Sequence, residues 1–240
     1  MIQHIPMTQN KHSQDKPTRS AWLIGATGLV GGELLKILLA DPHYASVHTA
    51  GRRAPSLTHA KMTAHVVDLG NLIQLAGLPA VDDVYCALGT TIKVAGSESA
   101  FKAVDLDVVV AVAKAALQLN RSARLGVVSA MGADAKSSVF YNRIKGEMEA
   151  AVAQLGYQNV SIARPSILAG DRDSLQQASR AGEHIGLKLM SAFSFLIPAN
   201  YKAIEAAEVA QALYQMVTAG DAGVRIAMSG ELRALAHGAN

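Results

Sequence analysis

The feature that most constrains the fold is a glycine turn near the start of the chain. Three apolar residues, Trp22-Leu23-Ile24, run directly into Gly25-Ala26-Thr27-Gly28-Leu29-Val30-Gly31, and a helical pattern follows. Between a strand and a helix, such glycines permit a tight turn, close approach of a ligand and close helix–strand packing, here assigned to Gly25, Gly28 and Gly31 in that order. The pattern predicts a dinucleotide-binding βα unit, because the helix offers free N–H groups to a pyrophosphate. A turn with a purely structural role remains the alternative.

Short apolar runs alternate with longer helical patterns along the rest of the chain. The expected strands are Ala21–Ile24, Val47–Ala50, Met62–Val67, Asp83–Ala87, Arg124–Ser129, Ser161–Ala163 and Gly223–Met228. The expected helices are Gly28–Leu39, Glu98–Leu119, Tyr141–Leu155, Ser174–Leu196 and Ala206–Ala219, the last ending at Gly220. This order predicts an α/β protein with a Rossmann-type, doubly wound parallel sheet.

The domain organisation follows from the same pattern. The polar residues 1–19 are expected to form a flexible tail, and residues 20–240 a single NAD(P)-binding domain. Within it, residues 166–205 are expected to form a small C-terminal lobe that covers the substrate. The apolar residues of this lobe, which include Phe193 and Tyr201, would line the pocket or belong to the core.

Composition excludes several other classes of protein. With 22 Lys+Arg against 19 Asp+Glu, the net charge is only +3, and aromatic residues make up 5% of the chain. No basic run is present, so we expect no nucleic-acid partner. The apolar stretch 187–198 is too short to span a bilayer, so no membrane span is expected. The single cysteine, Cys86, indicates a reducing, cytoplasmic location and excludes a Cys-rich zinc site. No other metal site is expected. Cys86 itself is expected to be a buried small hydrophobe rather than a nucleophile.

The end of the second strand indicates which dinucleotide is bound. An NAD site usually has an acidic residue here, but this chain has Gly51-Arg52-Arg53. Guanidinium groups suit a 2′-phosphate, so we expect NADP(H), with NAD(H) less favoured. Solvated loop charges would give the same pattern. Asp68, after the third strand, lies where it could meet the adenine or cap a following helix.

A tyrosine and a lysine one helical turn apart supply candidate chemistry. Tyr141 and Lys145 share a helix face, and Ser129 ends the preceding strand. An ammonium group stabilises a nearby phenolate and so brings the phenol toward acid–base work at neutral pH. Lys145 can also bond the nicotinamide ribose, and Ser129 can hold a substrate oxygen. The Y-x-x-x-K pattern is common by chance, and it gains meaning here from the glycine turn upstream.

Several separated motifs, in order, resemble one known family. They are Leu88-Gly89-Thr90-Thr91, Phe101–Asp105, Val128–Asp134, Tyr141–Glu149 and Arg164–Arg172. With the glycine turn and the Ser129, Tyr141 and Lys145 set, they resemble the atypical or extended short-chain dehydrogenases/reductases. Within that superfamily they are similar to the Tat-interacting-protein-like NAD(P)H-binding oxidoreductases and their bacterial relatives.

This resemblance implies a role for each matching residue. Thr27, Gly28, Leu29 and Val30 would line the phosphates, Arg52 and Arg53 the 2′-phosphate, Asp68 and Leu69 the adenine, and Leu88, Gly89 and Thr90 the ribose path; Pro165 and Ile167 would lie near the nicotinamide. The resemblance implies an NADP(H)-dependent reductase of a small carbonyl compound, as a monomer or homodimer. The alternatives are a non-catalytic NADP(H)-binding sensor or scaffold, and a nucleotide-sugar epimerase or dehydratase.

Overall fold

A seven-stranded parallel sheet forms the centre of the molecule. The computed structural model describes residues 18–169 and 198–238. The strand order is β3-β2-β1-β4-β5-β6-β9, so the chain winds outward in both directions from β1 and β4. The strands are β1 (Arg19–Ile24), β2 (Tyr44–Gly51), β3 (Met62–Val66), β4 (Asp83–Cys86), β5 (Arg124–Val128), β6 (Asn159–Arg164) and β9 (Gly223–Met228). The doubly wound α/β class expected from the sequence is confirmed.

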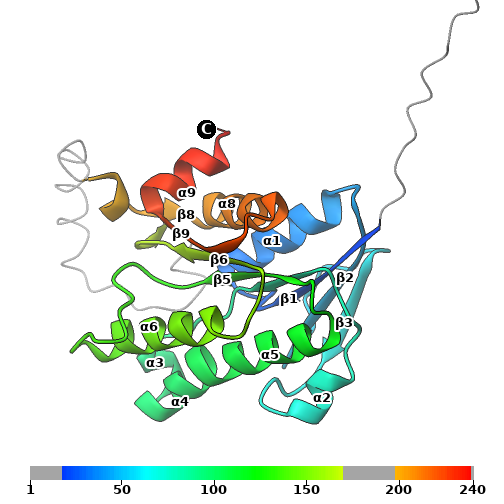
Figure 1. The fold of residues 1–240 in the computed structure, drawn as a ribbon, viewed down its shortest axis with the longest axis horizontal. Helices are drawn as coiled ribbons and strands as arrows, with labels where there is room; N and C mark the ends of the chain where they lie inside the picture. Colours follow the sequence, from blue (N-terminus) through cyan, green and yellow to red (C-terminus); the bar gives the residue numbers. More distant parts are fainter. Residues whose placement is uncertain (1–17, 170–197, 239–240) are drawn as a thin grey trace, which may run out of the picture.

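Helices cover both faces of this sheet (Figure 1). One face carries α1 (Leu29–Ala40), α8 (Ala206–Ala219) and α9 (Ser229–Ala236). The other carries α2 (Leu72–Ala76), α3 (Ile92–Ala95), α4 (Glu98–Lys102), α5 (Val109–Leu119) and α6 (Phe140–Ala153). Helix α8 ends where the sequence predicts, because Gly220 adopts the left-handed conformation with φ of 70°.

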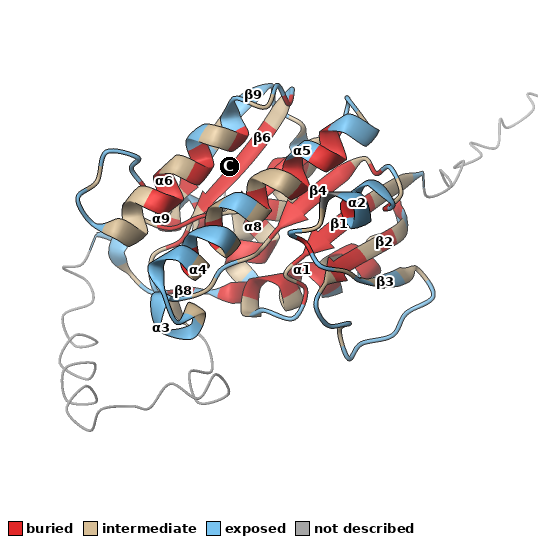
Figure 2. Ribbon diagram, turned by 90° about the horizontal axis from the view of Figure 1, so that it is seen from below, coloured by how far each residue is buried: buried red, intermediate tan, exposed pale blue. Residues whose placement is uncertain are grey.

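Each face of the sheet has its own hydrophobic core. Trp22 and Ile24 of β1 contribute to the core under α2 and α5, whereas Ala21 and Leu23 contribute to the core under α1 and α8. Figure 2 shows the buried residues gathered in the central strands and on the inward sides of these helices. Burial on both faces explains why the strand sequences are apolar without alternation.

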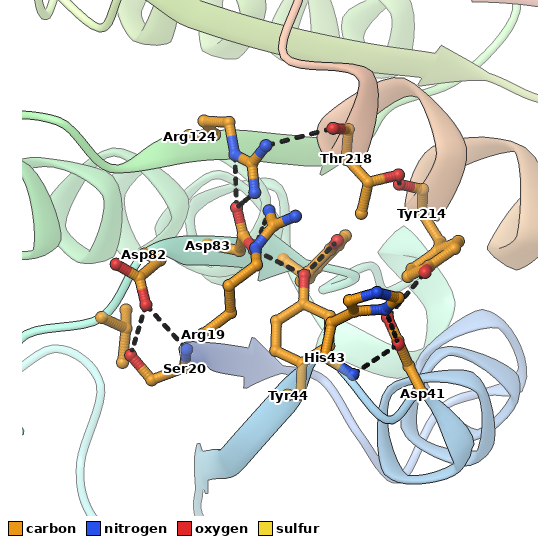
Figure 3. Close-up of polar contacts among 12 residues, drawn as sticks. Arg19, Ser20, Asp41, His43, Tyr44, Asp82, Asp83, Arg124, Tyr214 and Thr218 are labelled. Atoms are coloured by element: carbon orange, nitrogen blue, oxygen red, sulfur yellow. Dashed lines mark hydrogen bonds and ion pairs between the residues drawn. The ribbon is translucent and has the colours of Figure 1, made fainter. Parts of the chain in front are cut away.

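A polar network joins the amino ends of the central strands (Figure 3). The fully buried Asp83 of β4 accepts hydrogen bonds from Arg19 of β1 at 2.5 Å, Tyr44 of β2 at 2.5 Å and Arg124 of β5 at 2.6 Å. Arg124 also donates to the carbonyl of Thr218 at the end of α8. One carboxylate thus holds four neighbouring strands at the edge opposite to the glycine turn.

The structure departs from the expected elements in three ways. The predicted helix Glu98–Leu119 is divided into α4, a π-helical segment η1 (Ala103–Val108) and α5. The short helices α2, α3 and α9 were not predicted, because their few residues carry no clear apolar period. Strand β1 begins at Arg19, at the last residue assigned to the tail.

Much of the expected lobe 166–205 lies outside the described residues, as do the predicted helix Ser174–Leu196 and most of the tail. The described part contains β7 (Leu168–Ala169), a 3-10 turn η3 (Ala199–Tyr201) and β8 (Ile204–Glu205). Strands β7 and β8 pair in parallel, and Tyr201 is largely exposed. Among the described residues, no helix combines the length and apolarity needed to cross a membrane.

Candidate active site

The glycine turn between β1 and α1 has no room for a side chain at two of its glycines. Gly25 has φ of +88°, and a Cβ there would lie 2.5 Å from the carbonyl oxygen of Ala87 in the loop after β4. A Cβ on Gly31 would lie 2.0 Å from the carbonyl oxygen of Gly25, so helix α1 could not pack so closely on the turn. Gly28 is the N-cap of α1 and provides no side-chain cap. The first N–H groups of α1 are therefore open to a ligand.

A hollow in the surface lies beside this turn. Its lining includes six of the predicted cofactor-binding residues: Gly25, Thr27, Arg52, Arg53, Leu69 and Leu88. Thr49 of β2 also lines it, and the buried Oγ1 of Thr49 has no hydrogen-bond partner among the described residues. Arg52 and Arg53 are exposed and follow β2. The lining of the hollow thus has two cations and a hydroxyl without a partner among the described residues, and the open N–H groups of α1 follow the turn that borders it. These groups fit a phosphorylated nucleotide.

Other predicted contacts lie around the same edge of the sheet. Val30 is buried in the core beneath α1, so only its backbone can face a phosphate. Asp68 is exposed and accepts a hydrogen bond from the N–H of Gly70, whereas Asn71 caps α2. Asp68 is therefore not the helix cap that was its alternative role. Gly89 and Thr90 follow β4.

Ser129 and Pro165 follow the carboxyl ends of the adjacent strands β5 and β6. The N–H of Ser129 donates to the carbonyl of Ala163 at 2.8 Å, which extends the ladder between the two strands by one residue. The Ser129 Oγ is buried and has no partner among the described residues. Pro165 is buried, and Ile167 beyond it is 57% exposed. An unpaired buried hydroxyl at a strand end is available to a substrate oxygen.

Tyr141 and Lys145 lie in the first two turns of α6. The Lys145 ammonium is buried and forms an ion pair of 2.6 Å with the carboxylate of Asp105 from η1. The Tyr141 ring is half-buried, and its centroid lies 5.4 Å from that of Phe101 in α4. Asp105 is a site residue that the sequence interpretation missed. Asp105 ends one of the family motifs, but no spacing rule links it to Lys145.

Burial and two charges set the protonation of the Tyr141 phenol. Burial raises its pKa above the usual 10, Lys145 lowers it and Asp105 raises it, with a net upward shift. The hydroxyl is therefore protonated at neutral pH. Burial also raises the pKa of the Cys86 thiol to about 12, so Cys86 is the inert small hydrophobe expected from the sequence. No group of three metal-ligating side chains occurs among the described residues.

Proteins named FMP52 or HTATIP2 have sequences similar to that of this chain. Protein fmp52, mitochondrial, of Emericella nidulans is 37% identical over 164 residues, which cover 65% of this chain and 70% of that protein. The chain belongs to the FMP52/HTATIP2 family. HTATIP2 of Rattus norvegicus is 34% identical over 174 residues, covering 71% of this chain and 69% of that protein. The resemblance drawn from the motifs is therefore confirmed. No family model matches the chain.

Solved structures agree with the FMP52/HTATIP2 assignment at the level of the fold. A short chain dehydrogenase from Leptospira borgpetersenii with bound NAD+ has a TM-score of 0.66 at 11% identity and covers 97% of this chain and all of that one. An NADPH-bound short chain oxidoreductase from Pseudomonas aeruginosa PAO1, with an atypical catalytic centre, has a TM-score of 0.64 at 16% identity, covering 88% of this chain and 95% of that one. Both dinucleotides thus occur on this fold.

The names of the FMP52 relatives also bear on location. The fungal proteins are named as mitochondrial, so the cytoplasmic location expected from the cysteine content finds no support among them.

Proposed function

We propose that the chain is an NADP(H)-dependent oxidoreductase that reduces a small carbonyl compound. The observation that carries this proposal is the pair of Tyr141 and Lys145 on α6 together with the buried Ser129 hydroxyl after β5. A protonated phenol lies on the same helix as a buried ammonium, and a serine hydroxyl with no partner in the described part of the chain follows the strand before that helix. These are the groups that a proton transfer to a carbonyl oxygen requires.

In this proposal the first N–H groups of α1 hold the pyrophosphate, and the two exposed arginines hold the 2′-phosphate. The other contacts follow the family motif: Thr27, Gly28, Leu29 and Val30 beside the phosphates, Asp68 and Leu69 at the adenine, Leu88, Gly89 and Thr90 along the ribose path, and Pro165 and Ile167 near the nicotinamide. The preference for NADP(H) rests on Arg52 and Arg53, since the site has guanidinium groups where an NAD site has a carboxylate.

The chemistry at the substrate follows from three side chains. Ser129 donates a hydrogen bond to the carbonyl oxygen and fixes its position. The O–H bond of Tyr141 breaks as its proton passes to that oxygen, and Lys145 stabilises the phenolate that remains. The N–H groups of α1 and the two arginines would hold NADPH, which would supply the hydride to the carbonyl carbon and leave an alcohol and the oxidised cofactor.

The test is a panel of small aldehydes, ketones and quinones, with the absorbance of NADPH as the readout. We expect at least one class of carbonyl compound to be reduced, and Ser129→Ala to slow that reaction. If NADPH binds but no compound consumes it, the proposal fails and a non-catalytic sensor is the better account.

A further inference from the structure

The π-helical segment η1 places an acidic side chain behind the candidate active site. Segment η1 interrupts the long helix between α4 and α5, and Asp105 lies at its centre with no exposed surface. π-Helical turns are uncommon and concentrate at functional sites, because the wider turn redirects side chains. A carboxylate is rarely buried without a partner, so the contacts of Asp105 indicate what this turn does.

Asp105 connects two parts of the candidate site. One carboxylate oxygen, Oδ1, lies 2.6 Å from the Nζ of Lys145 on α6. The other, Oδ2, accepts a hydrogen bond of 3.1 Å from the backbone N–H of Thr90 in the loop after β4. The side chain of Lys145 is only 4% exposed. Both charges are therefore held away from water, where each acts strongly on its neighbours.

Besides burial, which raises the pKa of the Tyr141 phenol most, charged groups from two elements act on it. Lys145 of α6 lowers this pKa, and Asp105 of η1 raises it. Cys86 of β4 also faces the ion pair and is uncharged at neutral pH. Arg143, the other cation near the start of α6, donates to the carbonyls of Ser137 and Ser138. An unpaired Lys145 ammonium would lower the pKa of the Tyr141 phenol more than the Lys145 that is paired with Asp105.

We propose that Asp105 is a positioning residue, which holds Lys145 in place and offsets its charge so that Tyr141 keeps its proton until a carbonyl oxygen accepts it. This inference rests on the proposed reductase function. It also predicts the direction of the reaction. A protonated phenol is the acid that reduction of a carbonyl needs, whereas oxidation of an alcohol needs the phenolate as base.

The test is an NMR titration of the cofactor-free protein labelled with 13C at the tyrosine Cζ. The Tyr141 signal is identified by its loss in Tyr141→Phe. We expect Asp105→Asn to lower the titration midpoint of Tyr141 by about one pH unit or more. Asp107→Asn is the matched control, because Asp107 is exposed on the same segment, and it should leave the midpoint unchanged. A folded Asp105→Asn protein with the original Tyr141 midpoint would overturn the proposal.

A second pair of variants covers the case in which Asp105→Asn does not fold. That change leaves a buried ammonium without its partner, whereas Lys145→Met combined with Asp105→Asn removes both charges. We expect Tyr141 to titrate at lower pH in the double variant than in Lys145→Met alone. Equal midpoints in these two proteins would overturn the role of Asp105.

These titrations need neither cofactor nor substrate, so they separate the inference from the proposed function. If the midpoint falls as expected, the role of Asp105 in the protonation of Tyr141 holds even where no carbonyl compound is reduced. Where a substrate is found, the alkaline limb of its reduction should move to lower pH in Asp105→Asn. If the alkaline limb of the pH profile stays fixed while the NMR midpoint of Tyr141 moves, Tyr141 is not the proton donor. That result would leave the effect of Asp105 on Tyr141 intact.

Discussion

At the scale of single residues, the proposed preference for NADP(H) rests on Arg52 and Arg53. Both are exposed beside the hollow that the glycine turn borders. We expect NADPH to bind more tightly than NADH, and Arg52→Ala with Arg53→Ala to narrow that difference by about 10- to 100-fold, as expected for lost charge-assisted hydrogen bonds. Calorimetric titration with both cofactors measures the effect. Arg121→Ala, which removes an exposed cation from the loop before β5, should change neither affinity. Equal affinities in the unmodified protein would contradict this assignment.

The sequence predicts some residues of the site and misses others for a physical reason. Gly25, Gly31, Tyr141 and Lys145 are recognisable because local geometry sets their spacing: a turn needs glycine, and one helix turn aligns two side chains. Asp105 contributes through its ion pair with Lys145, which is far away in the chain, and Thr49 because it lines the same hollow as the glycine turn. Such contacts depend on how η1 packs against α6 and on how β2 faces the turn, and no short motif records either.

At the scale of elements, the packing of α1 on the turn can be tested with adjacent glycines. A Cβ on Gly31 would lie 2.0 Å from a backbone oxygen, whereas on Gly32 it would lie 3.8 Å from the nearest one. We expect Gly31→Ala to cost about 2 kcal/mol or more of unfolding free energy and to weaken NADPH binding. Gly32→Ala should raise stability by about 0.5–1 kcal/mol and leave binding intact. Urea unfolding and NADPH titration measure both. Equal effects of the two changes would argue against close packing at Gly31.

The strands of the sheet are easier to predict from the sequence than the helical region around η1. Strands such as β1 and β5 are continuous apolar runs between turn signals, and the structure has strands at these runs. The helix predicted over Glu98–Leu119 has an unbroken helical pattern, and the wider turn inside it accompanies the burial of Asp105 against Lys145. A tertiary ion pair of this kind leaves no local mark on the sequence.

At the scale of the whole molecule, the two ends of the parallel strands have different roles. The network around Asp83 joins the amino ends, and the candidate site lies at the carboxyl ends. We expect Asp83→Asn to cost about 3 kcal/mol of unfolding free energy, since Arg19 and Arg124 lose their shared carboxylate. Within the described ranges the neighbouring Asp82 side chain accepts only from Ser20, so Asp82→Asn should cost about 1 kcal/mol. Urea unfolding measures both. NADPH affinity should be unchanged in the folded variants, and a loss of binding in either would contradict this division.

The most direct test of the proposed reductase compares Tyr141→Phe with the unmodified protein on a carbonyl compound found in the panel. The change removes one oxygen and keeps the ring that packs against Phe101. The account predicts that NADPH affinity persists while kcat for reduction falls by about 10²–10⁴-fold, the range expected for a lost general acid. Reduction by Tyr141→Phe at the original rate, with the cofactor bound as before, would contradict the assignment of Tyr141 as the proton donor.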